Sequence, residues 1–362
     1  MTKYLDNRHP EIKEYHKILS PEFPSWLVDY IETIEMQRIH TISQSCGVDY
    51  SGIFNLPYFY SSLDHSVSVA LILWNFTGCK KQTLAGLFHD IATPVFKHVI
   101  DFLNNDHETQ ESTEEKTKAL IMNAPDIMVL LNRDGISVEE IYDYKIYPLA
   151  DNDTPRVAAD RLEYNFSSGL SFARVWDLDG IRESYNNLIL TRNEDGLPEF
   201  AFKDLNVAEK YIQTVSKLWP KWIENPDKLV MQFLADMVRM MVDSGYLTLE
   251  GLYTLSELEV VDMIRNCEDD YLREAFKKFQ DATISYEGKY PVEHKYCVSI
   301  KAKQRYVVPL VIHEDRPKRI TEISSQASKD IHDFLNHQEL PYAYFDFDFK
   351  PEAQKRTLNK QC

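Results

Sequence analysis

Apolar residues along this chain recur mostly at the spacing of amphipathic helices. The first helical pattern begins at Pro24 and runs to Ile39, and Asp64 then caps a helix from His65 to about Phe76. Further helices are predicted over residues 82–91 and 98–103, and from the cap cluster at 104–106 through 119. The polar residues 1–20 predict a loosely held arm, and the aromatic, turn-rich residues 47–60 predict a loop.

The second half continues this pattern and then changes character. Residues 124–150 predict a helical hairpin or a loop, and Asp153-Thr154-Pro155 predicts the start of a helix. A β-hairpin is expected around Asn193–Gly196. Helices are then expected at about 204–219, 227–244 and 254–279. Past Glu287 the pattern predicts strands at 296–301, 305–312 and 343–349 and a helix at 324–336. The sequence therefore predicts a mainly α fold, with a helical body over 1–285 and a small α+β segment over 286–362.

Charge and cysteine usage narrow the functional classes. The chain has 362 residues and a net charge of −17, which argues against non-specific binding to nucleic acid or to an anionic membrane. The five cysteines show no CxxC spacing and indicate reduced thiols. The N-terminal residues show no signal peptide, and the longest apolar run, Val69–Trp74, is too short to span a bilayer. We therefore expect a cytoplasmic protein.

Histidines and aspartates inside apolar runs indicate a metal site. His89 and Asp90 are adjacent at the end of the apolar run that includes Leu87 and Phe88, where burying both polar groups is costly without compensation. His65 opens one predicted helix, and Asp160 lies within another. Imidazole plus carboxylate is a suitable ligand set for a divalent ion such as Mn, Fe, Co, Ni, Zn or Mg.

These residues resemble the H…HD…D signature of the HD-domain metal-dependent phosphohydrolases. The resemblance covers about 36–170 and is most specific in MQRIHTISQ, LDHSVSVA, LFHDIATPVFKH and DRLEY. Within that superfamily it is closest to the deoxynucleoside triphosphate triphosphohydrolases. It implies an HD-type helical bundle in which His65, His89, Asp90 and Asp160 hold one divalent metal ion.

The resemblance also implies roles for neighbouring residues. His107, in DHETQES, matches a histidine beside the scissile phosphate and is the expected acid or base, with Glu108 as its possible orienter. His98 matches a second catalytic histidine, and Asp90 belongs to the catalytic group as well as to the metal. Arg161 would meet phosphate oxygens, and Tyr164 would pack on the sugar. Lys97 and Arg38 are further candidates to balance phosphate charge.

The chain departs from the family pattern at four positions. Thr93 stands where the family has a histidine of the catalytic pair, and Ala92 where it has glycine. Ser62 and Ser168 replace an arginine and a sugar-reading aspartate. The departures affect how a triphosphate would be bound and whether deoxyribose would be preferred. All four metal ligands of the signature remain.

The favoured function is thus hydrolysis of a phosphate ester or anhydride in a nucleotide, with a (deoxy)nucleoside triphosphate as the first choice. One alternative is a binuclear phosphodiesterase or 5′-nucleotidase, in which His98 and His107 bind a second ion. Another is a catalytically impaired regulator that binds nucleotides. The related branch also implies a homo-oligomer.

Overall fold

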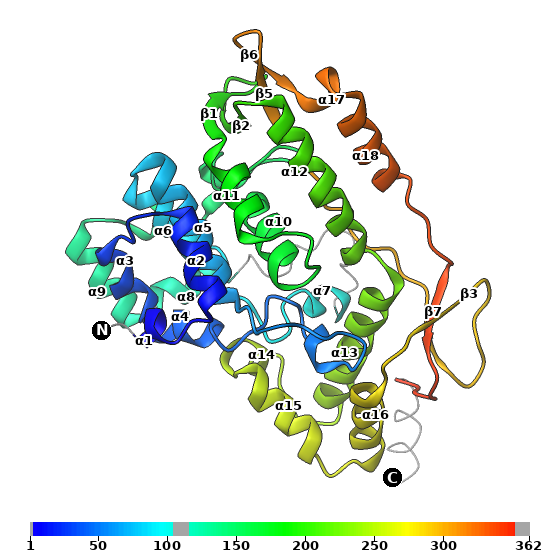
Figure 1. Cartoon of the computed structure of the whole chain (residues 1–362). Helices are drawn as coiled ribbons and strands as arrows, with labels where there is room; N and C mark the ends of the chain where they lie inside the picture. Colours follow the sequence, from blue (N-terminus) through cyan, green and yellow to red (C-terminus); the bar gives the residue numbers. More distant parts are fainter. Residues whose placement is uncertain (1–2, 104–115, 352–362) are drawn as a thin grey trace.

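The computed structural model describes residues 3–103 and 116–351, and its architecture is mainly α, as the sequence predicts. Within these residues the buried apolar side chains form two clusters. One joins the N-terminal helices to the middle of the chain, and the other lies around the long helix α13 (Asn225–Asp243). Figure 1 shows the two groups of helices on opposite sides of the molecule. The described helices include none with the length and apolar character needed to cross a bilayer.

Helix α5 is the centre of the first cluster. A capping box between Ser61 and Asp64 begins it, and Gly78 ends it in the left-handed conformation. It packs against the helix that carries the His89-Asp90 pair at its end, and a Cβ on Gly86 of that helix would lie 2.4 Å from the Leu73 side chain. The absence of a side chain at Gly86 therefore permits the close approach of two helices that carry candidate ligands. The elements of this part are α1 (Lys3–Asp6), α2 (Pro10–Leu19), α3 (Ser25–Ile31), α4 (Ile34–Ile39), η1 (Val48–Tyr50), α5 (Ser62–Thr77), α6 (Lys80–Phe88) and α7 (Val99–Leu103).

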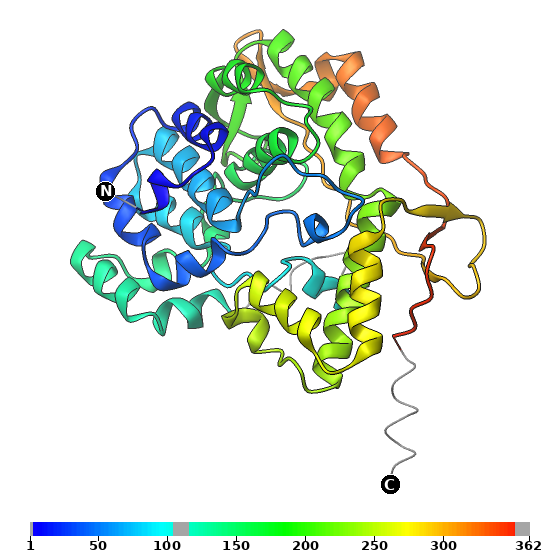
Figure 2. The same cartoon turned by 60° about the horizontal axis from the view of Figure 1, so that its bottom comes forward.

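The middle of the chain covers α5 and then turns toward the second cluster. Helix α10 packs on α5 and on α12, and the predicted hairpin is confirmed as β1 and β2. Figure 2 shows the chain continuing from these elements into α13 and α16, which lie side by side. The bounds are α8 (Thr117–Met122), α9 (Pro125–Asp134), η2 (Val138–Glu140), η3 (Tyr144–Ile146), α10 (Ala159–Ser171), α11 (Leu178–Asn186), β1 (Leu188–Arg192), β2 (Pro198–Phe202), α12 (Leu205–Leu218), η4 (Trp219–Trp222), α14 (Gly251–Thr254), α15 (Glu257–Asn266) and α16 (Asp270–Asp281).

The C-terminal segment is interleaved with the rest of the fold. Strand β5 pairs in parallel with β2 of the hairpin, which gives a sheet of order β1-β2-β5-β6, while β7 lies between β3 and β4. Helix α18 packs on α12, and β7 packs on α13. The described part of 286–362 therefore shares one sheet and both core clusters with the helical body. Its elements are β3 (Tyr286–Gly288), β4 (Tyr296–Val298), β5 (Leu310–His313), β6 (Arg316–Arg319), α17 (Ile320–Ile323), α18 (Ser325–Leu335) and β7 (Tyr342–Phe345).

The prediction of a loose N-terminal arm is wrong for residues 3–20. Tyr4 and Tyr15 are buried, and the Tyr4 hydroxyl donates to the Asp64 carboxylate at 2.8 Å. Arg8 forms an ion pair with the same carboxylate at 3.2 Å. The polar composition of this segment hid the few side chains that anchor it to the start of α5.

Two predicted helix limits are also wrong, because tertiary hydrogen bonds satisfy the backbone there. The helix expected from Pro24 to Ile39 is broken before Ile34, whose amide donates to Asp126 at 3.0 Å. The helix expected at Asp153 begins only at Ala159. In the intervening loop the Val157 amide donates to Glu199 at 3.1 Å, and the Pro155 carbonyl accepts from Val308 at 2.7 Å.

Candidate metal centre and pocket

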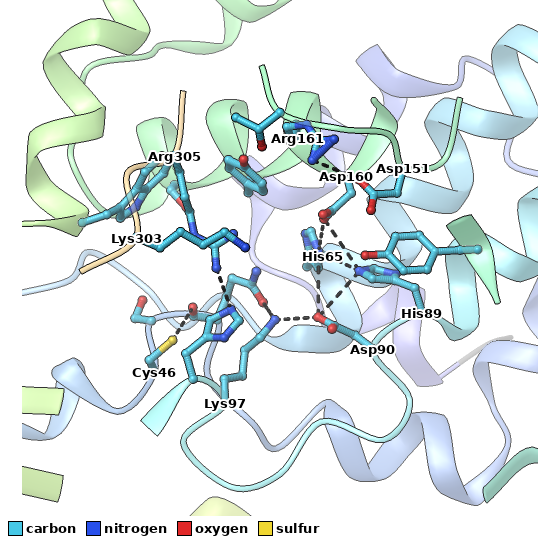
Figure 3. A pocket seen from close by; sticks show the side chains of 18 of the residues that line it. Cys46, His65, His89, Asp90, Lys97, Asp151, Asp160, Arg161, Lys303 and Arg305 are labelled. Atoms are coloured by element: carbon cyan, nitrogen blue, oxygen red, sulfur yellow. Dashed lines mark hydrogen bonds and ion pairs between the residues drawn. The ribbon is translucent and has the colours of Figure 1, made fainter. Parts of the chain in front are cut away.

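A pocket of about 540 Å³ opens between the two clusters, and most of the predicted site residues line it. Its walls come from α5, α10 and α13, from the loops around 44–48, 89–98 and 144–156, and from the irregular stretch before β5. Figure 3 shows the candidate ligands at one end of this pocket and Lys303 and Arg305 at the other.

His65, His89 and Asp160 converge at one end of the pocket, as the sequence predicts. The His65 Nε2 atom lies 3.1 Å from His89 Nε2 and 3.1 Å from Asp160 Oδ1. The His89 Nε2 atom lies 3.7 Å from the same Asp160 oxygen, and the three ligand atoms fall within 4.8 Å of one another. These residues come from α5, the end of α6 and the first turn of α10. Donor atoms at these separations can share one ion.

Asp90 stands at the edge of this group. Its Oδ2 atom lies 3.9 Å from His65 Nε2 and 3.8 Å from His89 Nε2. The same oxygen accepts a hydrogen bond from the Lys97 ammonium at 2.5 Å. Asp90 therefore faces the candidate ion position on one side and a lysine on the other (Figure 3).

Both imidazoles are oriented through their Nδ1 atoms. His65 Nδ1 contacts the carboxylate of Glu163, and His89 Nδ1 lies 2.7 Å from the Gly86 carbonyl. Glu163 is fully buried and also accepts from Tyr60 at 2.7 Å and from Ser167 at 3.1 Å. Donation from Nδ1 leaves Nε2 to point at the ion position. Sequence reasoning missed Glu163, although its place three residues after Asp160 puts both on one face of α10.

The electrostatics of this end favour a cation. Burial lowers the pKa of the His65 imidazole, but Glu163 and Asp160 outweigh burial and raise this pKa to about 10. Burial raises the pKa of Asp160, yet His65 and His89 hold it well below the usual range of an aspartate. The site thus stabilises positive charge at His65 Nε2.

The donor set fits a divalent ion. Two imidazole nitrogens whose other ring nitrogens are already engaged lie within reach of two carboxylates, which is the ligand chemistry of Mn, Fe, Co, Ni or Zn. His65, His89 and Asp160 would hold the ion, with Asp90 completing the set. Ligand histidines must be neutral, so binding would release the His65 proton.

Arg161 and Tyr164 line the pocket beside Asp160. The Arg161 guanidinium pairs with Asp151 at 3.0 Å and donates to Asn152 at 2.9 Å, so its position is fixed before any ligand arrives. The Tyr164 ring contacts the Trp222 ring edge-on, with 5.3 Å between the centroids. Both residues therefore line the pocket, and their roles in binding a substrate stay predictions.

His98 also lines the pocket, and two neighbours hold it. Its Nδ1 atom lies 2.8 Å from the Asp101 carboxylate, which is fully buried, and its Nε2 atom lies 3.4 Å from an Arg305 nitrogen. Burial lowers the pKa of His98, an effect that Asp101 opposes. Arg305 and Lys303 had no signal in the sequence, because nothing local shows that residues more than 200 positions later fold back to His98.

Several predicted residues lie elsewhere. His107 and Glu108 fall outside the described residues. Arg38 does not line the pocket; it donates to the carbonyl oxygens of Ile91 and Thr93 and so braces the loop after Asp90. Thr93 and Ser62 are buried away from the pocket, whereas Ser168 lines it.

Asp227, at the start of α13, is a further pocket residue that sequence reasoning missed. Burial raises the pKa of its carboxyl to about 8, although the neighbouring Lys228 opposes the shift. It lies with Met231 and Trp222 among the residues that line the pocket, so the lining also includes apolar surface and one protonatable carboxyl.

The chain is similar to two curated proteins over most of its length. A metal-dependent phosphohydrolase, cns2, from Cordyceps militaris is 23% identical over 295 residues, covering 78% of this chain and 80% of the relative. An uncharacterized protein, YdhJ, from Bacillus subtilis is 21% identical over 305 residues, covering 84% of this chain and 89% of the relative. No protein-family model matches the chain.

Solved structures of other proteins share the fold, among them one from Aquifex aeolicus and one from Bacteroides thetaiotaomicron. A hypothetical protein from Aquifex aeolicus superposes with a TM-score of 0.63 at 15% identity, covering 90% of this chain and 93% of that one. A phosphohydrolase from Bacteroides thetaiotaomicron superposes with a TM-score of 0.57 at 14% identity, covering 91% of this chain and 97% of that one. The names of the Cordyceps and Bacteroides proteins agree with the metal-dependent phosphohydrolase superfamily that the motifs resemble, and its triphosphohydrolase branch stays a prediction.

Proposed function

We propose that this chain is a metal-dependent phosphohydrolase that acts on a nucleotide. The observation that carries the proposal is the convergence of His65, His89 and Asp160 at the end of a pocket that is also lined by cations. The similarity to a protein named a metal-dependent phosphohydrolase supports the reaction class. The pocket can hold a phosphate at the ligand end and a larger, partly apolar group at the Tyr164–Trp222 wall.

A divalent ion at the ligand end would polarise a phosphoryl oxygen and lower the pKa of the attacking water. Arg161 and Lys97 lie where they can bind the remaining phosphate oxygens, and charge-assisted bonds of this kind stabilise charge that develops on phosphate. The water oxygen forms a bond to phosphorus while the bond from phosphorus to the leaving oxygen breaks.

His98 is the proton-transfer group that the described residues supply. With Nδ1 engaged by Asp101, its Nε2 atom lies in the pocket 3.4 Å from an Arg305 nitrogen, which donates to it. Once that contact opens, Nε2 can take a proton from the water and return it to the leaving oxygen. His107 remains a second candidate for this role on the motif resemblance alone. Tyr164 and Trp222 offer flat faces for the sugar or the base.

The finer prediction is a (deoxy)nucleoside triphosphate as substrate and one bound ion. It rests on the motifs HDIATPVFKH and DRLEY and on the cations that Lys303 and Arg305 add to the pocket. A monophosphate or diester substrate and a catalytically impaired nucleotide-binding regulator are the other outcomes to test.

The deciding experiment is a product assay. The purified chain, loaded with Mn²⁺, Co²⁺ or Mg²⁺, is incubated with nucleoside mono-, di- and triphosphates and cyclic nucleotides, and phosphate, pyrophosphate and triphosphate are measured. We expect metal-dependent release from one class and its loss in Asp160→Asn, with Asp153→Asn, a pocket residue outside the ligand group, as the matched control. Nucleotide binding without any release would instead support the regulator.

A further inference from the structure

Lys97 is an unusual neighbour for a candidate metal ligand. It lies almost fully buried, with 4% of its surface exposed, yet its ammonium lines the pocket. Its Nζ atom lies 2.5 Å from Asp90 Oδ2 and 2.7 Å from the Gln44 side-chain oxygen. Figure 3 shows Lys97 reaching Asp90 from the left, whereas His65 lies above Asp90 and His89 above it to the right. The Asp90 carboxylate thus lies between the ligand group and the fixed Lys97 ammonium.

The backbone holds this lysine in an unfavourable conformation. Phe96 and Lys97 both have positive φ, 62° and 45°, and such a conformation costs a non-glycine residue about 1–3 kcal/mol. Phe96 is buried in the second cluster, where its ring contacts Tyr50, so packing stabilises the turn. The fold therefore imposes the conformation that aims Lys97 at Asp90.

A second metal ion would need the same ligands that these cations occupy. In a binuclear site the carboxylate of Asp90 would bridge the ions, and His98 would bind the second one. Asp90 Oδ2 already contacts Lys97, and His98 Nε2 lies 3.4 Å from the Arg305 guanidinium. A carboxylate oxygen binds a transition metal at about 2.0–2.2 Å, so an ammonium at hydrogen-bond distance and a second ion compete for the same place.

We propose that Lys97 supplies the second positive charge of a single-metal site. The inference rests on the proposed phosphohydrolase function and deepens it. The lysine stays on Asp90 when the ion binds to His65, His89 and Asp160, and it presents the one N–H group that Asp90 and Gln44 leave over to a phosphate oxygen. It thus does electrostatically what a second ion does in a binuclear centre, and the chain binds one divalent ion.

Metal stoichiometry tests the first half of this proposal. The full chain is loaded with excess Mn²⁺ and desalted, and its metal content is measured by elemental analysis alongside Mn²⁺ electron paramagnetic resonance. We expect one ion per chain and no signal from a coupled Mn pair. Two ions per chain, or a coupled pair, would overturn the proposal.

Removing the charge of Lys97 tests the second half. Because a nearby ammonium repels the bound ion and competes for Asp90, Lys97→Met should bind Mn²⁺ about tenfold more tightly. The same variant should turn over substrate about 100-fold more slowly, since it lacks the cation that meets phosphate. Lys97→Arg, which keeps the charge, should retain most of the ion affinity of the wild type. Weaker ion binding in Lys97→Met would mean that the lysine only positions Asp90, and would refute the inference.

Lys80→Met is the matched control. Lys80 forms an ion pair with Asp134 at the same 2.5 Å, but neither residue lines the pocket, so its ion affinity and turnover should equal those of the wild type. If the wild-type chain releases no phosphate from any substrate, the proposed function fails, while stoichiometry and ion affinity still decide the role of Lys97. If Lys97→Met turns over substrate as fast as Lys80→Met does, the proposed role of Lys97 is also refuted.

Discussion

Replacing Glu163 by glutamine should weaken metal binding while leaving the fold almost intact. Glu163 contacts His65 Nδ1 and accepts from Tyr60 and Ser167, at a position with no exposed surface. The glutamine oxygen can still accept from His65, and its amide group can donate to a hydroxyl. What disappears is the negative charge that makes the imidazole a stronger ligand.

The expected magnitude follows from the carboxylate–histidine pair. Loss of such a partner typically reduces metal affinity by about 10- to 100-fold, which corresponds to about 1.4–2.7 kcal/mol. Glu163→Ala should act differently, because it removes the acceptor of four buried donors, namely His65, Tyr15, Tyr60 and Ser167. Each buried donor costs about 1–3 kcal/mol when left unpaired. We therefore expect glutamine to affect metal affinity most, and alanine to affect the free energy of unfolding as well.

The assay is a competition titration of Mn²⁺ or Zn²⁺ on each variant, combined with denaturant unfolding of the metal-free chain. Glu199→Gln is the matched control, since Glu199 is equally buried but pairs with Arg319 outside the pocket. It should lose stability without a change in ion affinity. An ion affinity of Glu163→Gln within twofold of the wild type would refute the orienting role of this carboxylate.

The other predictions concern the pocket and the N-terminal anchor. Arg305→Ala should raise KM about tenfold, because it removes a cation that lies in the pocket beside His98, and steady-state kinetics with the exposed Arg316→Ala as control would check this. Arg8→Ala should reduce the free energy of unfolding by about 3 kcal/mol, because Asp64 keeps a buried charge without its cation; a loss under 1 kcal/mol in urea unfolding would contradict this. Burial raises the pKa of Asp227 to about 8, above its unfolded value, so the folded chain favours the protonated form and loses stability as pH rises from about 4 to 8. Asp227→Asn should therefore be more stable than the wild type at pH 9 but not at pH 4. The unfolding midpoints of both chains are measured between these pH values, and a difference between variant and wild type that does not change with pH would refute the reasoning.

The sequence predicted those parts of the fold that depend on local pattern. The α5 helix, the hairpin after Leu188 and the long α13 helix follow from apolar spacing and from turn residues, and the structure confirms them. The prediction of a helix between Asp153 and Ala159 was wrong, because the backbone there forms hydrogen bonds with Glu199 and with the stretch before β5. Such partners are distant in sequence, so no local pattern reports them.

The residues of the candidate site also fall into those that a local pattern predicts and those that depend on distant contacts. His65, His89 and Asp160 each stand out because a polar ligand interrupts an apolar run, and their convergence needs only helices that pack together. Lys97 was visible as a cation beside the HD pair, but its contact with Asp90 depends on two consecutive residues with positive φ. Arg305 depends on the return of the C-terminal segment to the pocket, which the alternating pattern of that segment does not encode.

The distribution of charge would allow this acidic chain to accept the anionic substrate that we propose. The net charge is −17, yet the described pocket residues include six cations and five aspartates. Desolvation raises the pKa of one of those aspartates, Asp227, to about 8. A divalent ion at His65, His89 and Asp160 would make this pocket clearly positive, whereas the remaining surface repels anions. Phosphate affinity would then depend on the ion far more than in a basic protein, because no surrounding positive field compensates for its loss. On the proposed function, this arrangement would link nucleotide binding to metal loading.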